Sequence, residues 1–472
     1  MTFNNLSPII PGFYPDPTMC SAPDGLYLAN SSFELFPGAP VFHSRDGYAW
    51  RQVGNVLNRT DQVDLRTFDQ ASSGIYGSTL RFHDNKFWFI TTNIAQSSQG
   101  QLLFTSESAE GPWSDPILIE GVTGIDPDIA WTEKGECFIT WCSSEGGIAQ
   151  VTIDPNSGKV QSETRRLWSG TGMKYPEGPH LYHHDGWWYL VIAEGGTERG
   201  HCVSVARSRR PDGGFESNPA NPILTHRSTA HPVQSVGHLD LAEHDGRWLA
   251  CYHGTRPQGW TPEFHVLGRE TMLCGVQWVD GWPVIDESDS LPQSPDTSLV
   301  TRFNEPLEAR WVSPGGDLSN ATVDGALHLS AGPLVGIRAQ DLRWRCEADV
   351  DPLGGTLRFA VHLDDNHWFA IEVTDGLARG IGRSIPFEQE FGRLEVPPGS
   401  VTLAIQAVDP TESTTPTGPD SIELIVDGHT LCSLDGRHLS TEVAAGFTGR
   451  LIGLQSTQGK VVVEGFRYRS AD

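Results

Sequence analysis

Short apolar runs separated by turn signals fill the first 290 residues of the chain. At five places a two-residue turn leads into aromatic or β-branched residues, which is the pattern of a β-hairpin. These five segments are 24–28, 84–88, 134–138, 185–189 and 245–249. Their second turn residues lie at 25, 85, 135, 186 and 246, so the intervals are 60, 50, 51 and 60 residues. A repeat of about 50 to 60 residues predicts one four-stranded sheet per unit and a five-bladed β-propeller.

The pattern changes after the fifth repeat. A partial sixth copy at 280–284 is expected to close the ring against the first blade, and a polar, proline-bearing stretch predicts a linker at 291–302. Further on, short strand-like runs recur without any long stretch of helical period. They lie at 344–350, 356–363, 367–373, 401–408, 422–426 and 460–468. The chain is therefore predicted to be all-β, with a propeller over 1–290 and a β-sandwich of the concanavalin-like jelly-roll type over 303–472.

Composition and charge agree with this fold class and exclude several partners. Fifteen Trp, 51 Gly and 32 Pro beside 4 Met are typical of strands and turns. The net charge of −26 opposes binding to a phosphate backbone, so nucleic acid is excluded as a partner. No run approaches the roughly 20 apolar residues that cross a bilayer, so no membrane partner is expected. The first residues lack a basic segment followed by an apolar one, which predicts a cytoplasmic location.

Three acidic residues occupy the same position relative to their hairpins. Asp16, Asp126 and Glu177 each lie nine residues before the second residue of the following turn, and each stands beside or near proline. The other two repeats place Tyr76 and, one residue further on, His238 in this phase. One acidic residue in such a turn-forming segment is common, but turns alone do not explain why all three acids lie at the same distance from the following hairpin. If the strand leading into each hairpin is the innermost one, these side chains share one pocket.

Clustered carboxyl groups suit the cleavage of a glycosidic bond. That reaction needs an acid at the leaving oxygen and a base or nucleophile on the opposite face of the sugar. A neighbouring negative charge raises the pKa of the acid, whereas hydrogen bonds keep the base ionised. A third carboxyl group can therefore adjust the other two.

Several motifs carry a resemblance to a known family. They are Pro-Gly-Phe-Tyr-Pro-Asp-Pro at 11–17, Ser-Ser-Phe-Glu at 31–34, Asp-Pro at 126–127, Glu-Gly-Pro-His-Leu-Tyr at 177–182 and Ala-Glu-Gly-Gly-Thr at 193–197. Further matches are Gly-His-Leu-Asp-Leu at 237–241, Gly-Thr-Arg-Pro at 254–257, Gly-Arg-Glu-Thr at 268–271 and Asp-Gly-Trp-Pro at 280–283. In order and spacing they resemble glycoside hydrolase family 43, and they look most like its β-xylosidase branch with a C-terminal sandwich. The resemblance covers nearly all of 8–285 and is weaker over 303–472.

The resemblance implies a five-bladed propeller that hydrolyses with inversion. Carried over by motif, it implies Asp16 as general base, Glu177 as general acid and Asp126 as the residue that adjusts their pKa values. Inversion predicts that the carboxyl groups of base and acid stand roughly 6.5 to 9.5 Å apart, which leaves room for the attacking water.

The same resemblance implies the residues that bind the substrate. Arg269 would hydrogen-bond the sugar in the −1 subsite and keep Asp126 or its neighbours ionised, and Phe33 would form an apolar wall. Tyr76, Thr197 and His238 are further candidate substrate-binding residues.

No cofactor is required in the resembling family, although its central histidine often lies next to a hydrated ion. The implied metal here is a Ca²⁺ at the propeller centre, held near His238 mostly through water. One departure concerns Tyr76, Gly77 and Ser78, which stand where family members usually have Trp-Ala-Pro. That segment borders the pocket, so the identity of the sugar that the pocket accepts stays open.

The sequence favours an inverting exo-glycosidase that releases terminal β-D-xylose from small oligosaccharides. An α-L-arabinofuranosidase, or a bifunctional enzyme acting on arabinoxylan-type oligosaccharides, is the alternative. Two other classes stay open: a non-catalytic carbohydrate-binding propeller, and a retaining transglycosylase acting on fructosides, whose carboxyl groups would stand about 5 Å apart. A homo-oligomer is compatible with every one of these.

Overall fold

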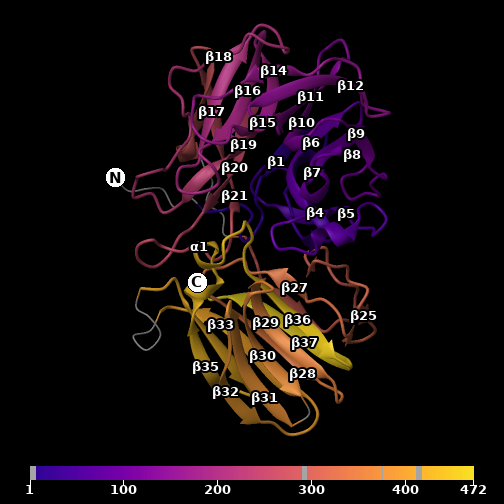
Figure 1. Cartoon of the computed structure of the whole chain (residues 1–472), viewed down its shortest axis with the longest axis vertical. Coiled ribbons are helices and arrows are strands. Elements are labelled where there is room, and N and C mark those ends of the chain that lie inside the picture. The colour runs from indigo at the N-terminus through magenta and orange to yellow at the C-terminus, as the bar shows by residue number, and fades with distance from the viewer. Residues whose placement is uncertain (1–6, 290–294, 375, 411–416, 472) are drawn as a thin grey trace.

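The structure is a computed structural model that describes residues 7–289, 295–374, 376–410 and 417–471. Figure 1 shows two β-rich parts, an N-terminal one in indigo to magenta above and a C-terminal one in orange to yellow below. The chain is nearly all-β, as its sequence predicts. Within these described residues, helical turns are limited to Leu65–Phe68, Ile94–Gln96, Glu287–Asp289, Gly436–Leu439 and α1 (Thr441–Ala444). Over the described ranges, no helix has the length and apolar character to cross a membrane.

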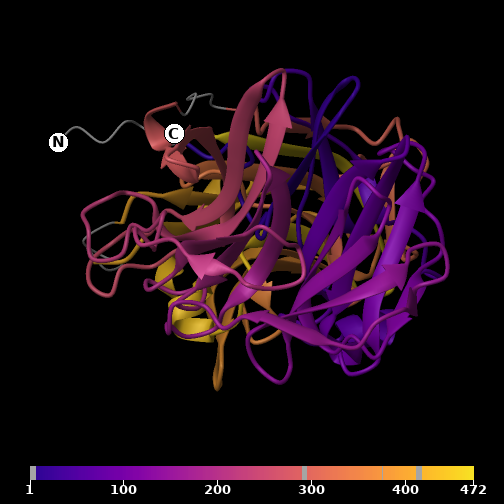
Figure 2. The same cartoon turned by 90° about the horizontal axis from the view of Figure 1, so that it is seen from above.

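The N-terminal part consists of five sheets that follow one another along the chain (Figure 2). The first two contain β1 (Thr18–Ala22), β2 (Gly25–Ala29), β4 (Gly38–Ser44) and β5 (Arg51–Leu57), then β6 (Ile75–His83), β7 (Lys86–Asn93), β8 (Gly100–Ser106) and β9 (Ile117–Glu120). The third contains β10 (Gly124–Trp131), β11 (Cys137–Ser143), β12 (Ile148–Asp154), β13 (Lys159–Val160) and β14 (Arg165–Trp168). The last two contain β15 (Glu177–His184), β16 (Trp187–Glu194), β17 (Cys202–Ser208) and β18 (Glu216–Ser217), then β19 (Gln234–His244), β20 (Arg247–Thr255), β21 (Glu270–Val279) and β22 (Trp282–Asp286).

The five predicted hairpins are confirmed, because each joins the first and second strands of one sheet. In the second of them Asp84 and Asn85 have φ of 52° and 55°, the left-handed values that a two-residue hairpin turn requires. The first strands contact one another in the order β1, β6, β10, β15, β19, and β19 contacts β1 again. Apolar clusters fill each of the five spaces between neighbouring sheets, including that between the fifth and the first. The inner strands therefore form a closed ring.

The partial repeat at 280–284 does not close this ring against the first sheet. β22 pairs with β21 as the outer strand of the fifth sheet, because the first sheet already has four strands of its own. The N-terminal segment makes the connection instead: the amides of Ile9 and Ile10 donate to the carbonyl of Thr271 at 2.9 and 3.4 Å.

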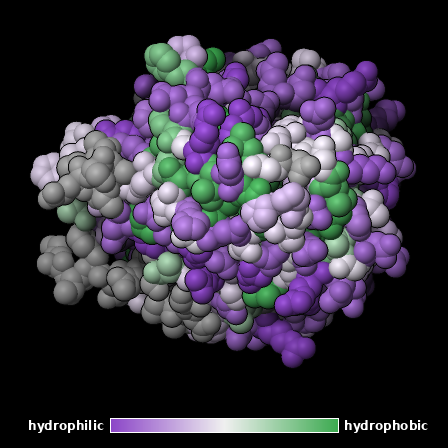
Figure 3. Space-filling view, turned by 90° about the horizontal axis from the view of Figure 1, so that it is seen from below, coloured by the Kyte–Doolittle hydropathy of each residue, from purple (hydrophilic) through white to green (hydrophobic). Residues whose placement is uncertain are grey.

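The C-terminal part consists of two sheets packed over one core. One sheet contains β25 (Ala321–Val323), β26 (Leu327–Ser330), β37 (Lys460–Ser470), β28 (Trp344–Asp351), β33 (Val401–Val408), β34 (Ser421–Val426) and β35 (His429–Asp435), with β23 (Leu299–Thr301) beside β37. The other contains β27 (Val335–Arg338), β36 (Leu451–Gln458), β29 (Thr356–Asp364), β30 (His367–Thr374), β31 (Leu377–Ser384) and β32 (Phe387–Glu395). Seen from below, the surface is largely hydrophilic, with apolar side chains gathered near the middle (Figure 3).

The two parts are joined by more than the connecting chain. β24 (Ser313–Pro314) pairs with β3 (Leu35–Phe36) of the N-terminal part. β23 falls within the predicted linker 291–302 and pairs with β37, so the C-terminal sheet begins before residue 303. Residues 291–294 of that linker lie outside the described residues.

Candidate active site

Irregular backbone at the start of the inner strands directs polar side chains toward the ring centre. Strands β6, β10, β15 and β19 each contain a register shift near their first residues. Asp16, Asp126 and His238 have φ of 51°, 55° and 51°, values that non-glycine residues rarely adopt. Such bulges re-aim side chains and are common beside active sites.

One cavity of about 530 Å³ collects all eight residues selected from the sequence. They are Asp16, Phe33, Tyr76, Asp126, Glu177, Thr197, His238 and Arg269. The sequence analysis did not select Lys174, Tyr175, Glu198 and Phe447, which also line it. The first three lie on loops beside Glu177, whereas Phe447 comes from the C-terminal part, where no motif indicated a functional residue.

Asp16 is almost completely buried among partners that favour its ionised form. Its Oδ1 accepts from Arg269 Nη1 at 2.6 Å, and its Oδ2 accepts from the Ser31 hydroxyl at 2.7 Å. His238 Nδ1 lies 3.6 Å from Oδ1. Burial alone would raise the pKa of Asp16, but Arg269, His238 and His253 together hold that pKa well below its ordinary value. Asp16 is therefore a carboxylate at neutral pH.

Glu177 is the first residue of β15, and its surroundings favour the protonated form of its carboxyl group. Burial, with the nearby charges of Asp126 and Asp16, raises the pKa of Glu177 to about 8, and only Arg269 acts against this. The pKa of Asp126 is also raised, first by burial, although its Oδ2 accepts from the Gly178 amide at 3.0 Å. The cavity thus holds one ionised carboxylate and, close by, a pair of carboxyl groups that retains a proton near neutral pH.

Arg269 is expected to keep Asp126 or its neighbours ionised. Its ion pair is with Asp16, and its charge also lowers the pKa of Asp126. Arg269 is 4% exposed, and its buried Nη2 has no hydrogen-bond partner among the described residues. Arg269 also lines the cavity, and its binding to the substrate stays a prediction.

Three aromatic rings form the apolar wall of the cavity. The Phe33 ring lies 4.8 Å from the Tyr76 ring and 5.8 Å from the Phe447 ring, centroid to centroid. The Phe447 amide donates to the Ser72 hydroxyl at 2.9 Å, which fixes this C-terminal loop against the N-terminal part. The wall therefore depends on both parts of the chain.

The segment 76–78 differs from the usual family motif, and two of its three residues, Tyr76 and Gly77, line the cavity. The Tyr76 hydroxyl donates to the Ser72 carbonyl at 2.9 Å. A Cβ atom at Gly77 would lie 2.4 Å from Asp126 Oδ1, so only glycine allows that carboxyl group its present position. Ser78 is not among the lining residues.

Two histidines that the sequence analysis did not select lie behind Asp16. The Asp16 amide donates to His253 Nδ1 at 3.1 Å, and His253 Nε2 lies 3.2 Å from His201 Nδ1. Burial lowers the pKa of both rings, so both are neutral at pH 7. They support the backbone that carries Asp16.

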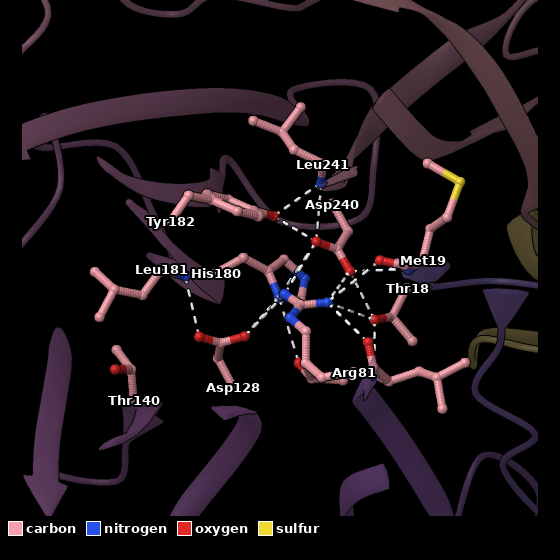
Figure 4. A network of polar contacts seen from close by, with 12 residues as sticks. Thr18, Met19, Arg81, Asp128, Thr140, His180, Leu181, Tyr182, Asp240 and Leu241 are labelled. Carbon is pink, nitrogen blue, oxygen red and sulfur yellow. Dashed lines mark hydrogen bonds and ion pairs between the residues drawn. The ribbon is translucent and has the colours of Figure 1, made fainter. Parts of the chain in front are cut away.

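The centre of the ring below this layer is filled by a guanidinium (Figure 4). Arg81 of β6 forms ion pairs with Asp240 at 2.7 Å and Asp128 at 3.0 Å. The Thr18 hydroxyl donates to Asp240 at 2.7 Å, and the Tyr182 hydroxyl donates to it as well. The network therefore includes residues of all five inner strands.

This network does not support the calcium ion expected near His238. The carboxylates that face the ring centre are already neutralised by Arg81. Moreover, the described residues contain no group of three or more His, Cys, Asp or Glu side chains that could hold a metal. We therefore assign no metal to the site.

Comparison with known proteins agrees with the motifs. The family model described as Glycosyl hydrolases family 43 matches residues 5–283. A non-reducing end alpha-L-arabinofuranosidase, BoGH43B of Bacteroides ovatus, is 38% identical over 304 residues, which are 62% of this chain and 56% of that protein. A xylosidase/arabinosidase of Butyrivibrio fibrisolvens is 38% identical over 296 residues, which are 59% and 56% of the two chains. The chain thus spans little more than half the length of these relatives.

Solved structures are similar over nearly the whole chain. The structure titled Bacteroides ovatus Xyloglucan PUL GH43B has a TM-score of 0.89 at 29% identity, covering 98% of this chain and 99% of its own. A xylan beta-1,4-xylosidase from Bacillus halodurans has a TM-score of 0.87 at 26% identity, covering 99% and 100%. Both parts of the fold therefore occur together in other proteins.

Proposed function

The chain belongs to glycosyl hydrolase family 43, and we propose that it is an inverting exo-glycosidase that releases terminal β-D-xylose from xylo-oligosaccharides. The observation that carries the proposal is the opposite electrostatics of Asp16 and Glu177 in one cavity. Two carboxyl groups whose pKa values are driven apart supply a base and an acid at the same pH.

In the proposed step, Asp16 accepts a proton from a water molecule, and the water oxygen forms a bond to the anomeric carbon. Glu177 donates its proton to the glycosidic oxygen as the bond between that oxygen and the anomeric carbon breaks. Arg269 holds Asp16 ionised, and the negative charge of Asp126 helps to keep Glu177 protonated. The arrangement requires a separation of roughly 6.5 to 9.5 Å between the two carboxyl groups, which stays a prediction.

Terminal α-L-arabinofuranose is the second candidate substrate. It is favoured by the relative from Bacteroides ovatus, which is named an arabinofuranosidase, and by the one from Butyrivibrio fibrisolvens, whose name includes both activities. The differences at Tyr76 and Gly77 lie in the wall of the cavity, where they can select between a pyranose and a furanose ring.

We also propose that the five N-terminal sheets are the blades of one propeller covering 1–290, followed by an accessory sandwich over 303–472. The closed ring of inner strands and the five apolar clusters between sheets support the blade count. The cytoplasmic location and a homo-oligomeric state stay predictions.

The test is hydrolysis of 4-nitrophenyl β-D-xylopyranoside and α-L-arabinofuranoside, with the anomer of the released sugar followed by NMR. Xylose released first as the α-anomer supports the proposal, and preference for the arabinofuranoside supports the second candidate. Retention of configuration would refute the mechanism. Glu177→Gln should lose much more activity on xylobiose than on the nitrophenyl glycoside, since nitrophenolate leaves without a proton.

A further inference from the structure

We propose that Tyr175 is the platform on which the leaving-group sugar lies, with Lys174 and Glu198 as its polar partners. This inference rests on the proposed function, because it assigns the neighbour of the released sugar to one side of the same cavity. It concerns which leaving groups the enzyme accepts, a property that the three carboxyl groups alone do not determine.

The position of Tyr175 relative to Glu177 is the first argument. A general acid gives its proton to the oxygen of the leaving group, so that group must lie next to the acid. Tyr175 precedes Glu177 by two residues, and both side chains line the cavity. The Tyr175 side chain is 62% exposed, which places it at the rim rather than at the base. A sugar unit that extends outward from the bond being cleaved would meet this ring.

The surrounding loops hold the ring in place, which is the second argument. The Gly195 amide donates to the Lys174 carbonyl at 2.7 Å. Glu194, which is fully buried, accepts from the amide and the hydroxyl of Thr171 at 2.8 and 2.9 Å. The two loops beside the acid are therefore tied together at two points just before Tyr175.

The ring itself rests on backbone. A Cβ atom at Gly196 would lie 3.2 Å from Tyr175 Cδ2, so one edge of the ring contacts the only residue type without a side chain. Tyr175 has φ of 51°, and the proline that follows restricts it further. An aromatic ring held in this way gives contact area at little cost in conformational entropy on binding.

Polar groups beside the ring suit the hydroxyl groups of a sugar. Lys174 Nζ lies 3.8 Å from Glu198 Oε1, with both side chains about 70% exposed. Such an exposed pair contributes little to stability and can exchange its contact for hydrogen bonds to a ligand. The apolar ring of Tyr175 and the polar pair of Lys174 and Glu198 together match a pyranose, which presents C–H groups on its faces and hydroxyl groups around its edge.

Two aromatic side chains that are more exposed than Tyr175 lack these features. Trp260 and Phe387 are 72% and 75% exposed, but neither lines the cavity. Phe387 begins β32, which is the edge strand of its sheet in the C-terminal part. It is therefore a matched control for the loss of an exposed ring.

The test compares Tyr175→Ala with wild-type protein on xylobiose and on methyl β-D-xylopyranoside. Both substrates have poor leaving groups that need the proton of Glu177, but only xylobiose has a sugar ring in the leaving group. We expect kcat/KM on xylobiose to fall about tenfold, which corresponds to about 1.4 kcal/mol, and on the methyl glycoside to change less than about twofold. Tyr175→Phe should retain activity on xylobiose, and Phe387→Ala should match wild type on both.

Equal losses on the two substrates would show that Tyr175 acts through Glu177 and would overturn the assignment. Unchanged activity on xylobiose would overturn it as well. If wild-type protein prefers arabinofuranosides, methyl α-L-arabinofuranoside and an arabinofuranosyl xylobiose take the places of the two probes. If the wild-type protein hydrolyses neither xylosides nor arabinofuranosides, the proposed function itself is refuted. This outcome differs from the two results for the Tyr175 variant that would overturn only the assignment of the platform.

Discussion

Removing the charge of Asp126 should lower the upper pKa of the pH profile. Activity requires Glu177 to be protonated, so it is lost as the pH rises through the pKa of that residue, which is about 8. After burial, the charge of Asp126 is the largest contribution that raises this pKa. Asp126→Asn keeps the size of the side chain and removes the charge. The falling limb of activity should therefore move to lower pH.

The size of the shift follows from Coulomb's law. Two unit charges roughly 7 Å apart at an effective dielectric constant near 20 repel by about 2.4 kcal/mol, nearly two pKa units. The Gly178 amide and Arg269 offset part of the Asp126 charge. Asp126 and Glu177 also share protons, and in such a pair the higher pKa always falls when one partner is removed. We expect a decrease of about one unit.

The assay is the pH dependence of kcat/KM for xylobiose between pH 5 and 10, since kcat/KM reports the ionisation of the free enzyme, to which the pKa of about 8 applies. Glu133→Gln is the control, because it removes a negative charge from an exposed turn between β10 and β11 of the same sheet as Asp126. A falling limb that stays within about 0.3 units of wild type in Asp126→Asn would refute the electrostatic role of Asp126. A wild-type profile without a falling limb between pH 7 and 9 would refute Glu177 as the acid.

Three further changes test the wall, the floor and the support of the site. Phe447→Ala should lower kcat/KM about tenfold at an unchanged melting temperature, because it opens the aromatic wall. Phe391→Ala in β32 is the control. Equal activity of the two variants would contradict the role of Phe447 in the wall. Gly77→Leu should lower kcat at least about tenfold, since its side chain would displace Asp126, whereas the Ala that family members usually have here requires only a small shift of that carboxyl group; normal kinetics of Gly77→Leu would show that the space can adapt. Arg81→Met should destabilise the fold by about 3 to 5 kcal/mol in urea unfolding, because two buried carboxylates lose their partner; a loss below about 1 kcal/mol would disprove that the network stabilises the ring.

Much of the fold could be predicted because each sheet repeats one pattern. A turn with left-handed backbone, such as Asp84-Asn85, fixes a hairpin locally, and five such hairpins at regular spacing fix the order of the sheets. The same spacing placed Asp16, Asp126 and Glu177 in one phase, and the structure brings them to one cavity. What repeats along the chain is visible in the sequence, since each copy supports the interpretation of the others.

Features that depend on a single long-range contact could not be predicted in this way. Phe447 reaches the cavity because its amide bonds to Ser72, 375 residues away, and no local pattern of the C-terminal part marks that loop.

The position of Arg81 was predictable in principle, because Asp128 and Asp240 lie two residues after Asp126 and His238 and form a second polar layer around the same ring. Buried carboxylates in such a layer need a cation, and Arg81 on a different inner strand supplies it. Because Arg81 supplies that charge, the two carboxylates of this layer are neutralised without a metal ion.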